Sequence, residues 1–155
     1  MPRWKVRPVN EVEFDAWSAL FRGYAEFYEW PTSAGHQRQI WDWIHRERRI
    51  ECLVVVPVDG DDEVGPPVGL AHLRTWVRPL RGVECWYLDD LFVDPETRGA
   101  GAVDALFAHI ITAARDRRYP VVRWTTAEDN ERAQRVYDRY ATRTTWVTYD
   151  LSVDA

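Results

Sequence analysis

A glycine-rich turn is the first stretch whose residue types can do chemistry. It reads VDPETRGAGAVDALF over residues 93–107 and leads into an amphipathic, helix-like pattern. The N–H groups at the start of a helix lack intrahelical partners and lie at the positive end of the helix dipole, so they attract anions. Gly99 and Gly101 permit the backbone angles of such a turn and leave room for a phosphate oxygen, and Arg98 can add a charge. The turn therefore predicts either a phosphate-binding loop or simply a tight turn before a capped helix.

This turn is not one of the common nucleotide-binding loops. A dinucleotide fingerprint needs a third glycine and a downstream acidic residue, and the ATP-type loop needs Gly-Lys followed by Ser or Thr. Val103 occupies a position where close contact with a phosphate favours Gly or Ala. Its helical spacing with Leu106, Phe107 and Ile110 predicts that its side chain faces the sheet while its amide faces the turn.

A second constellation lies in AEDNERAQRVYDRYA, residues 127–141. Asn130, Ala133 and Tyr137 follow at intervals of three and four residues, which places them on one face of a helix. A tyrosine hydroxyl, with a pKa of about 10, stays protonated at neutral pH and can act as a general acid. The alternative is that Asn130 caps the helix and Tyr137 belongs to the core.

Hydropathy periodicity predicts the elements that must position these residues. Strands are expected at 4–9, 50–58, 68–77, 83–93, 121–126 and 143–153, and helices at 11–30, 35–48, 102–118 and 130–140. Asn10 is the expected N-cap of the first helix, and Pro31-Thr32-Ser33 ends it and caps the second. The order β-α-α-β-β-β-α-β-α-β indicates an α/β fold in which helices flank a mixed, mostly antiparallel central sheet.

Length and composition limit the class of protein. The 155 residues suit one domain, 1–155, with a single core. A formal net charge of −5 argues against a nucleic-acid partner, whose phosphates require Lys and Arg. No apolar run has the length of a signal peptide or a membrane span, which predicts a cytoplasmic protein without a membrane partner. Cys52 and Cys85 lack metal-ligand spacing, so we expect buried thiols and no metal.

Together, the two constellations resemble the GCN5-related N-acetyltransferase (GNAT) family. The family signature Arg/Gln-x-x-Gly-x-Gly/Ala is matched at Arg98 and Gly101, and Val103 departs from its last position. The later element Asn-x-x-Ala-x-x-x-Tyr is matched at residues 130–137, while the Gly-Phe that usually follows is replaced by Ala141-Thr142. The element order is also that of the family, so the resemblance covers nearly the whole chain.

The resemblance implies that an acetyl group moves from acetyl-CoA to a primary amine by direct attack in a ternary complex. Acetyl-CoA would enter a V-shaped gap between the fourth and fifth strands, where backbone groups of Leu91, Phe92 and Val93 would pair with its pantetheine arm. Asn130 and Ala133 would hold this arm, and Tyr137 would be the general acid. The loop residues expected at the pyrophosphate are Arg98, Gly99, Ala100, Gly101, Ala102 and Val103.

The acceptor side is predicted from an acidic pair. An amine with a pKa near 10 is protonated at pH 7, so its attack needs a base or a water path. Asp89 and Asp90 are adjacent in a strand and should point to opposite faces, so only one is expected to line the cleft. Asp89 is the first candidate for water-linked base or amine anchor and Asp90 the second; alternatively, one carboxylate caps a backbone kink. Within the family, YLDDLFV is most similar to the polyamine and small-amine acetyltransferases.

The first helix adds an aromatic wall to the predicted acceptor site. Tyr24, Tyr28 and Glu29 are the candidates for substrate binding, because aromatic faces and a carboxylate attract a cation. The alternative is an ordinary core stripe. Two other functions remain open from the sequence: a non-catalytic acyl-CoA-binding or partner-binding module of the same fold, and an acetyltransferase for protein lysines or N-termini. The identity of the amine and a homodimer are also left open.

Overall fold

The computed structural model describes residues 3–154, which separate into two compact units on either side of the Trp124–Thr125 bond. The elements of the first unit are β1 (Arg3–Pro8), α1 (Phe14–Phe27), α2 (Ala34–His45), β2 (Glu51–Asp59), β3 (Asp62–Glu63), β4 (Gly69–Arg78), η1 (Pro79–Arg81), β5 (Val83–Val93), η2 (Pro95–Thr97), α3 (Ala102–Asp116) and β6 (Val122–Arg123). The second unit contains α4 (Glu131–Tyr137).

The strands form one mixed sheet in the order β1-β2-β4-β5-β6, and β3 pairs with β2. All pairs are antiparallel except β5–β6, which is parallel. The predicted α/β fold with a mostly antiparallel sheet is therefore confirmed. Long β-branched and aromatic runs build β2, β4 and β5, because such side chains pack well on a pleated surface.

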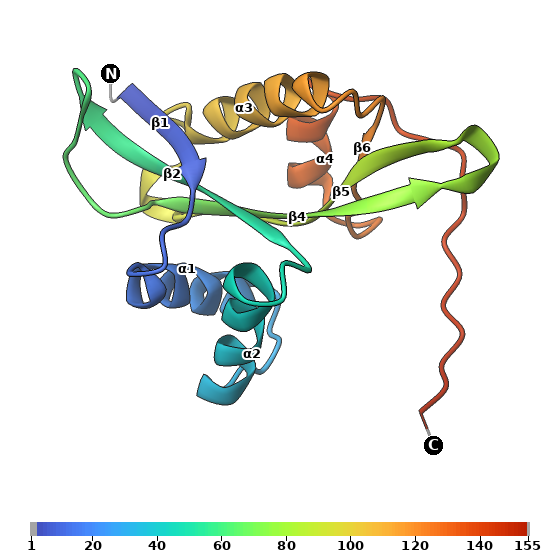
Figure 1. Ribbon diagram of the computed structural model, residues 1–155, viewed down its shortest axis with the longest axis horizontal. Helices are drawn as coiled ribbons and strands as arrows, with labels where there is room; N and C mark the ends of the chain where they lie inside the picture. Colours follow the sequence, from blue (N-terminus) through green and yellow to red (C-terminus); the bar gives the residue numbers. More distant parts are fainter. Residues whose placement is uncertain (1–2, 155) are drawn as a thin grey trace. The chain divides into compact units, whose positions relative to one another are not determined.

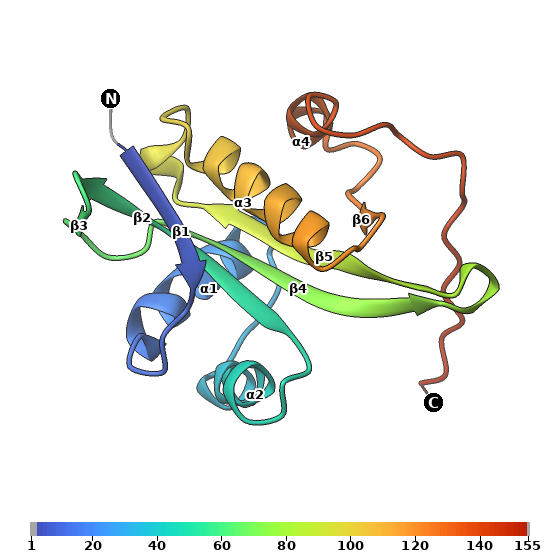
Figure 2. The ribbon, with the colours of Figure 1, turned by 45° about the horizontal axis from the view of Figure 1, so that its top comes forward.

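Helices cover both faces of this sheet. Helices α1 and α2 lie on one face and α3 lies on the other (Figure 1), and a second view shows α3 running along the strands (Figure 2). The buried residues of α3 are Ala102, Leu106, Phe107, Ile110 and Ala114, which form one face of the helix. Val103 flanks this face and is half-buried. Its side chain thus lies at the edge of the packed face.

Two helix starts show how local chemistry sets the boundaries. Asn10 does not cap α1, which begins at Phe14. Instead, the Glu13 carboxylate accepts the backbone N–H of Asn10 and pairs with Arg7, so the chain between them forms a turn before the helix. Helix α2 begins as predicted, because the Ser33 hydroxyl accepts the N–H of His36 at 3.1 Å.

In the second unit, α4 is shorter than predicted and the expected last strand is not formed. Asn130 caps α4 by accepting the N–H of Ala133, and the helix ends at Tyr137. Residues 141–154 contain neither helix nor strand, so the prediction of a strand over 143–153 was wrong. The segment has β-forming residues in alternation, but a strand also requires a hydrogen-bonded neighbour, and none of the strands in residues 3–154 pairs with it.

Candidate functional site

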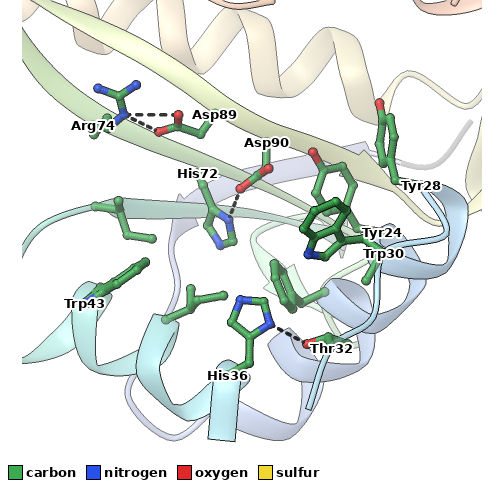
Figure 3. A pocket seen from close by; sticks show the side chains of 14 residues that line it. Tyr24, Tyr28, Trp30, Thr32, His36, Trp43, His72, Arg74, Asp89 and Asp90 are labelled. Atoms are coloured by element: carbon green, nitrogen blue, oxygen red, sulfur yellow. Dashed lines mark hydrogen bonds and ion pairs between the residues drawn. The ribbon is translucent and has the colours of Figure 1, made fainter. Parts of the chain in front are cut away.

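A cavity of about 480 Å³ lies between the layer of α1 and α2 and the strands β4 and β5 (Figure 3). Its walls are largely aromatic and aliphatic, with ionisable groups on the strands β4 and β5 and one histidine on α2. The aromatic lining residues are Phe21, Tyr24, Tyr28, Trp30 and Trp43, and the ionisable ones besides these tyrosines are His36, His72, Arg74, Asp89 and Asp90. This size and lining are typical of a site for a small molecule.

A β-bulge brings both aspartates to the cavity. In the β4–β5 ladder His72 pairs with Asp90 and Leu73 pairs with Leu88, so Asp89 has no partner across the strand. The extra residue interrupts the alternation of side chains. Asp89 and Asp90 therefore both line the cavity, and the prediction that only one could do so was wrong.

Asp90 is held by a buried histidine. The carboxylate of Asp90 lies 2.9 Å from Nδ1 of His72, whose side chain is only 1% exposed. The indole N–H of Trp17 donates to Nε2 of the same ring at 3.0 Å, so Nε2 carries no proton. Burial lowers the pKa of His72, and contacts with Cys52 and Asp90 raise it. The hydrogen bond from Trp17 nevertheless requires a neutral ring, which donates its single proton from Nδ1 to Asp90. His72 is thus a positioning residue and not a base.

The pKa values of the two aspartates move in opposite directions. Burial raises the pKa of Asp90, but hydrogen bonds from His72 and Tyr24 outweigh this effect and hold it below its usual range. Burial also raises the pKa of Asp89, and there it prevails over the opposing contact with Arg74. Asp90 is consequently a stable anion, and Asp89 is the better proton acceptor of the two.

Arg74 on β4 forms the remaining charged contact of the cavity. Its Nε donates to both carboxylate oxygens of Asp89, at 2.9 and 3.2 Å, and its guanidinium carbon lies 4.5 Å from the centre of the Tyr87 ring. The two terminal NH₂ groups donate to no acceptor in the part of the chain that the structure describes. In Figure 3 these groups point away from Asp89.

The glycine-rich turn forms a cradle of free N–H groups. Gly99 and Gly101 have φ values of 80° and 90°, and Gly101 occupies the N-cap of α3. Within residues 3–154 no acceptor takes the backbone N–H groups of residues 99–103; the first intrahelical bond comes from Ala105. Trp4 on β1 donates its indole N–H to the Ala100 carbonyl at 2.6 Å and fixes the turn. Five unpaired donors at a helix start fit a phosphate group.

Beside this turn, β5 has an unpaired edge. Parallel pairing with β6 is confined to Trp86 and Tyr87, so residues 88–93 have no partner strand on that side among the described residues. The open edge includes Leu91, Phe92 and Val93, which were predicted to contact the pantetheine arm. The Val93 carbonyl of this edge accepts from Arg98, and the other backbone groups of an open edge can pair with a ligand that carries amide groups.

Several predicted site residues lie elsewhere or have structural partners. Glu29 does not line the cavity; it is exposed, in a turn with φ 53° after α1. Arg98 bonds to the Val93 carbonyl and lies over the Phe27 ring. The Asn130 side chain caps α4, in which Ala133 and Tyr137 are half-buried; the role of this second-unit motif stays a prediction.

Sequence reasoning missed the roles of His72, Arg74 and Trp4. The available signal was weak, since a polar residue at a buried position of a strand has no recognisable role until its partner strand is known. The predicted free thiols are confirmed, as Cys52 and Cys85 are buried and unbridged. In the described chain, no group of three or more His, Cys, Asp or Glu side chains could hold a metal, and no helix is long and apolar enough to cross a membrane.

Solved structures of acetyltransferases share this architecture over the whole chain. A probable acetyltransferase has a TM-score of 0.82 at 22% identity and covers 97% of this chain and 99% of its own. An aminoglycoside N-acetyltransferase in complex with CoA has a TM-score of 0.80 at 15% identity, and the match covers 99% of this chain and 97% of that one. The ribosomal-protein-alanine N-acetyltransferase of Brucella melitensis biovar Abortus 2308 has a TM-score of 0.78 at 18% identity, and the match covers 98% of this chain and 100% of that one. At such identities the likeness concerns the fold alone.

The chain belongs to the acetyltransferase (GNAT) family, whose model matches residues 17–141. A curated relative, the D-amino-acid N-acetyltransferase of Saccharomyces cerevisiae (strain ATCC 204508 / S288c), is 32% identical over 89 residues. These residues are 57% of this chain and 55% of the relative, so the chain spans about half the length of that protein.

Proposed function

We propose that this protein transfers the acetyl group of acetyl-CoA to a primary amine of a small molecule, by direct attack in a ternary complex. One observation carries the proposal: an aromatic cavity contains a carboxylate, Asp90, that His72 and Tyr24 hold in its ionised form. An ammonium group is the natural partner of a fixed anion among aromatic faces.

The donor side rests on the cradle at the start of α3. The free N–H groups of residues 99–103 fit the pyrophosphate of acetyl-CoA, and the open edge of β5 fits its amide-containing arm. When bound, acetyl-CoA supplies a thioester carbonyl to the acceptor. Val103 is compatible with this role, because its half-buried side chain lies along the helix face and its amide stays at the turn.

The proton must leave the ammonium before nitrogen can attack. In our proposal Asp90 binds the ammonium and Asp89, whose pKa burial raises, accepts its proton through water. The nitrogen lone pair then attacks the thioester carbon, and the C–S bond breaks as the tetrahedral intermediate collapses and the nitrogen loses its second proton to water. The leaving thiolate takes a proton to become the CoA thiol. Tyr137 is the candidate donor of this proton, on the resemblance of its motif to that of the family.

The named functions of relatives agree with an amine acceptor. One curated relative is named for D-amino acids and one solved structure for aminoglycosides, both of them small amines. A second solved structure is named for an alanine of a ribosomal protein, which is a protein substrate. A cavity of about 480 Å³ favours a small molecule, because it can enclose most of a ligand of that size.

The test is a thiol-release assay with acetyl-CoA and a panel of polyamines, amino acids, aminoglycosides and peptides, alongside isothermal titration with acetyl-CoA. We expect saturable binding of acetyl-CoA and amine-dependent release of thiol. No binding at millimolar concentration refutes the proposal. Binding without thiol release on any amine instead supports a non-catalytic acyl-CoA-binding module.

A further inference from the structure

We infer that the amine acceptor also carries a carboxylate, which Arg74 binds, so that the substrate class is an amino acid with an apolar or aromatic side chain. The inference rests on the proposed function and identifies the acceptor for the same cavity. Three features of the described residues carry it: the geometry of Arg74, its position beside Asp90, and the charges of the cavity wall.

The protein orients the guanidinium of Arg74, but only its Nε has a hydrogen-bond acceptor among the described residues. Asp89 holds its Nε and the Tyr87 ring lies beside its guanidinium carbon, so two contacts orient the planar group, while the side chain keeps 44% of its surface exposed to a ligand or water. Its terminal NH₂ groups nevertheless have no protein acceptor among residues 3–154. A fixed guanidinium with two free NH₂ groups suits a carboxylate, which it can bind through two parallel hydrogen bonds.

The opposite charge lies close by on the same wall. His72 and Arg74 are two residues apart on β4, so their side chains project to one face about 7 Å apart along the strand. Across the ladder, His72 pairs with Asp90, and Arg74 and Asp90 both line the cavity (Figure 3). An amino acid that spans this spacing would place its ammonium at Asp90 and its carboxylate at Arg74.

The charges of the lining argue against a polyamine. Among the Arg, Lys, Asp and Glu side chains, the described lining contains Arg74, Asp89 and Asp90, and the first two pair with each other. Only Asp90 then remains for a cationic substrate, so the second and third ammonium groups of a polyamine would enter the cavity unpaired, which is costly. The rest of the wall, including Tyr28, Trp30 and Trp43, is aromatic and suits an apolar side chain.

The experiment compares matched pairs that differ only in the carboxylate: phenylalanine with phenethylamine, and tryptophan with tryptamine, using both enantiomers of each amino acid, with spermidine added. Thiol release is measured for the wild type, for Arg74→Gln and for Arg81→Gln. Arg81 provides the matched control, because it is exposed at the turn after β4 and does not line the cavity.

We expect kcat/KM at least tenfold higher for one enantiomer of the amino acid than for its decarboxylated partner. Arg74→Gln should lower kcat/KM for the amino acid at least tenfold more than for phenethylamine, mainly through KM, because any effect that passes through Asp89 is common to both substrates. Arg81→Gln should change neither. Equal or better rates with phenethylamine, a preference for spermidine, or an equal effect of Arg74→Gln on both members of a pair overturns the inference while leaving the proposed function intact.

Should no amine release thiol, the proposed function fails, and calorimetric binding to the CoA-loaded protein still decides the inference. Binding of phenylalanine that Arg74→Gln weakens at least tenfold supports a carboxylate site. Binding that is absent, or equal for phenylalanine and phenethylamine, overturns it.

Discussion

Replacing His72 by Phe tests whether this histidine sets the ionisation of Asp90. Phenylalanine keeps a planar ring in the core but removes both ring nitrogens. The N–H of Trp17, whose side chain is fully buried, loses its acceptor, at a cost of about 1–3 kcal/mol. Asp90 loses a hydrogen bond to a charged group, worth about 1.5–3 kcal/mol. The greater apolarity of Phe offsets about 1.5–3 kcal/mol of this loss.

The expected free energy of unfolding therefore falls by about 1–3 kcal/mol, which denaturant titration can measure. The functional effect is sharper. Losing 1.5–3 kcal/mol of stabilisation of the Asp90 anion raises the pKa of this carboxyl by about 1–2 units. The acidic limb of the kcat/KM profile for the amine, where Asp90 becomes protonated, should move to higher pH by the same amount.

His36→Phe is the matched control, because His36 lines the same cavity but bonds to Thr32 and not to Asp90. It should leave the acidic limb in place. His72→Gln, which keeps one donor and one acceptor, should restore part of both the stability and the profile. If the free energy of unfolding of His72→Phe is within about 0.5 kcal/mol of the wild type and the acidic limb of its kcat/KM profile does not move, His72 does not set the ionisation of Asp90.

Four further predictions concern other parts of the chain. Val103→Gly should change the affinity for acetyl-CoA by less than about tenfold, or 1.4 kcal/mol, and recovery of binding from an inactive parent would contradict this. Trp4→Phe removes one hydrogen bond from the turn and should raise the Kd for acetyl-CoA about 2- to 10-fold by calorimetry, whereas an unchanged Kd would show that the bond to Ala100 is dispensable. Hydrogen bonds from Arg7 lower the pKa of Glu63 from 4.5 to about 2, so its stabilising effect is present above pH 4.5 and lost as pH falls through about 2; acid-unfolding curves of Glu63→Gln should lack this pH dependence, and identical curves would contradict it. Val147, Tyr149, Leu151 and Val153 alternate with other residues and are exposed at 73%, 89%, 89% and 85%, so we predict that this segment pairs with a second copy. Deleting residues 142–155 should then turn a dimer into a monomer by light scattering, and a monomeric full-length chain would contradict the prediction.

The sequence predicted the elements with strong periodicity. The run that became β5 and the helical stripe of α3 were located almost to the residue, because a short apolar run between turn residues marks a buried strand and a period of 3.6 marks a helix with one buried face. The turn at Gly99 and Gly101 was also recognisable, since its positive φ values need glycine.

The acceptor site was harder to predict because it depends on register between strands. The bulge at Asp89 follows from how β4 and β5 pair, and the sequence around Asp89 contains no local pattern that predicts it. The contact of His72 with Asp90 and Trp17 likewise joins three separate elements. Over residues 143–153 the sequence predicted a strand that the structure does not form, because this segment has no partner strand among residues 3–154.

The most direct test of the central claim is the detection of N-acetylated amine by mass spectrometry, with the wild type, Asp90→Asn and, as a control, the exposed Asp116→Asn. We predict acetylated product from the wild type and from Asp116→Asn, and a KM for the amine at least tenfold higher in Asp90→Asn. Bound acetyl-CoA with no acetylated product from any amine, or an unchanged KM in Asp90→Asn, would contradict the account.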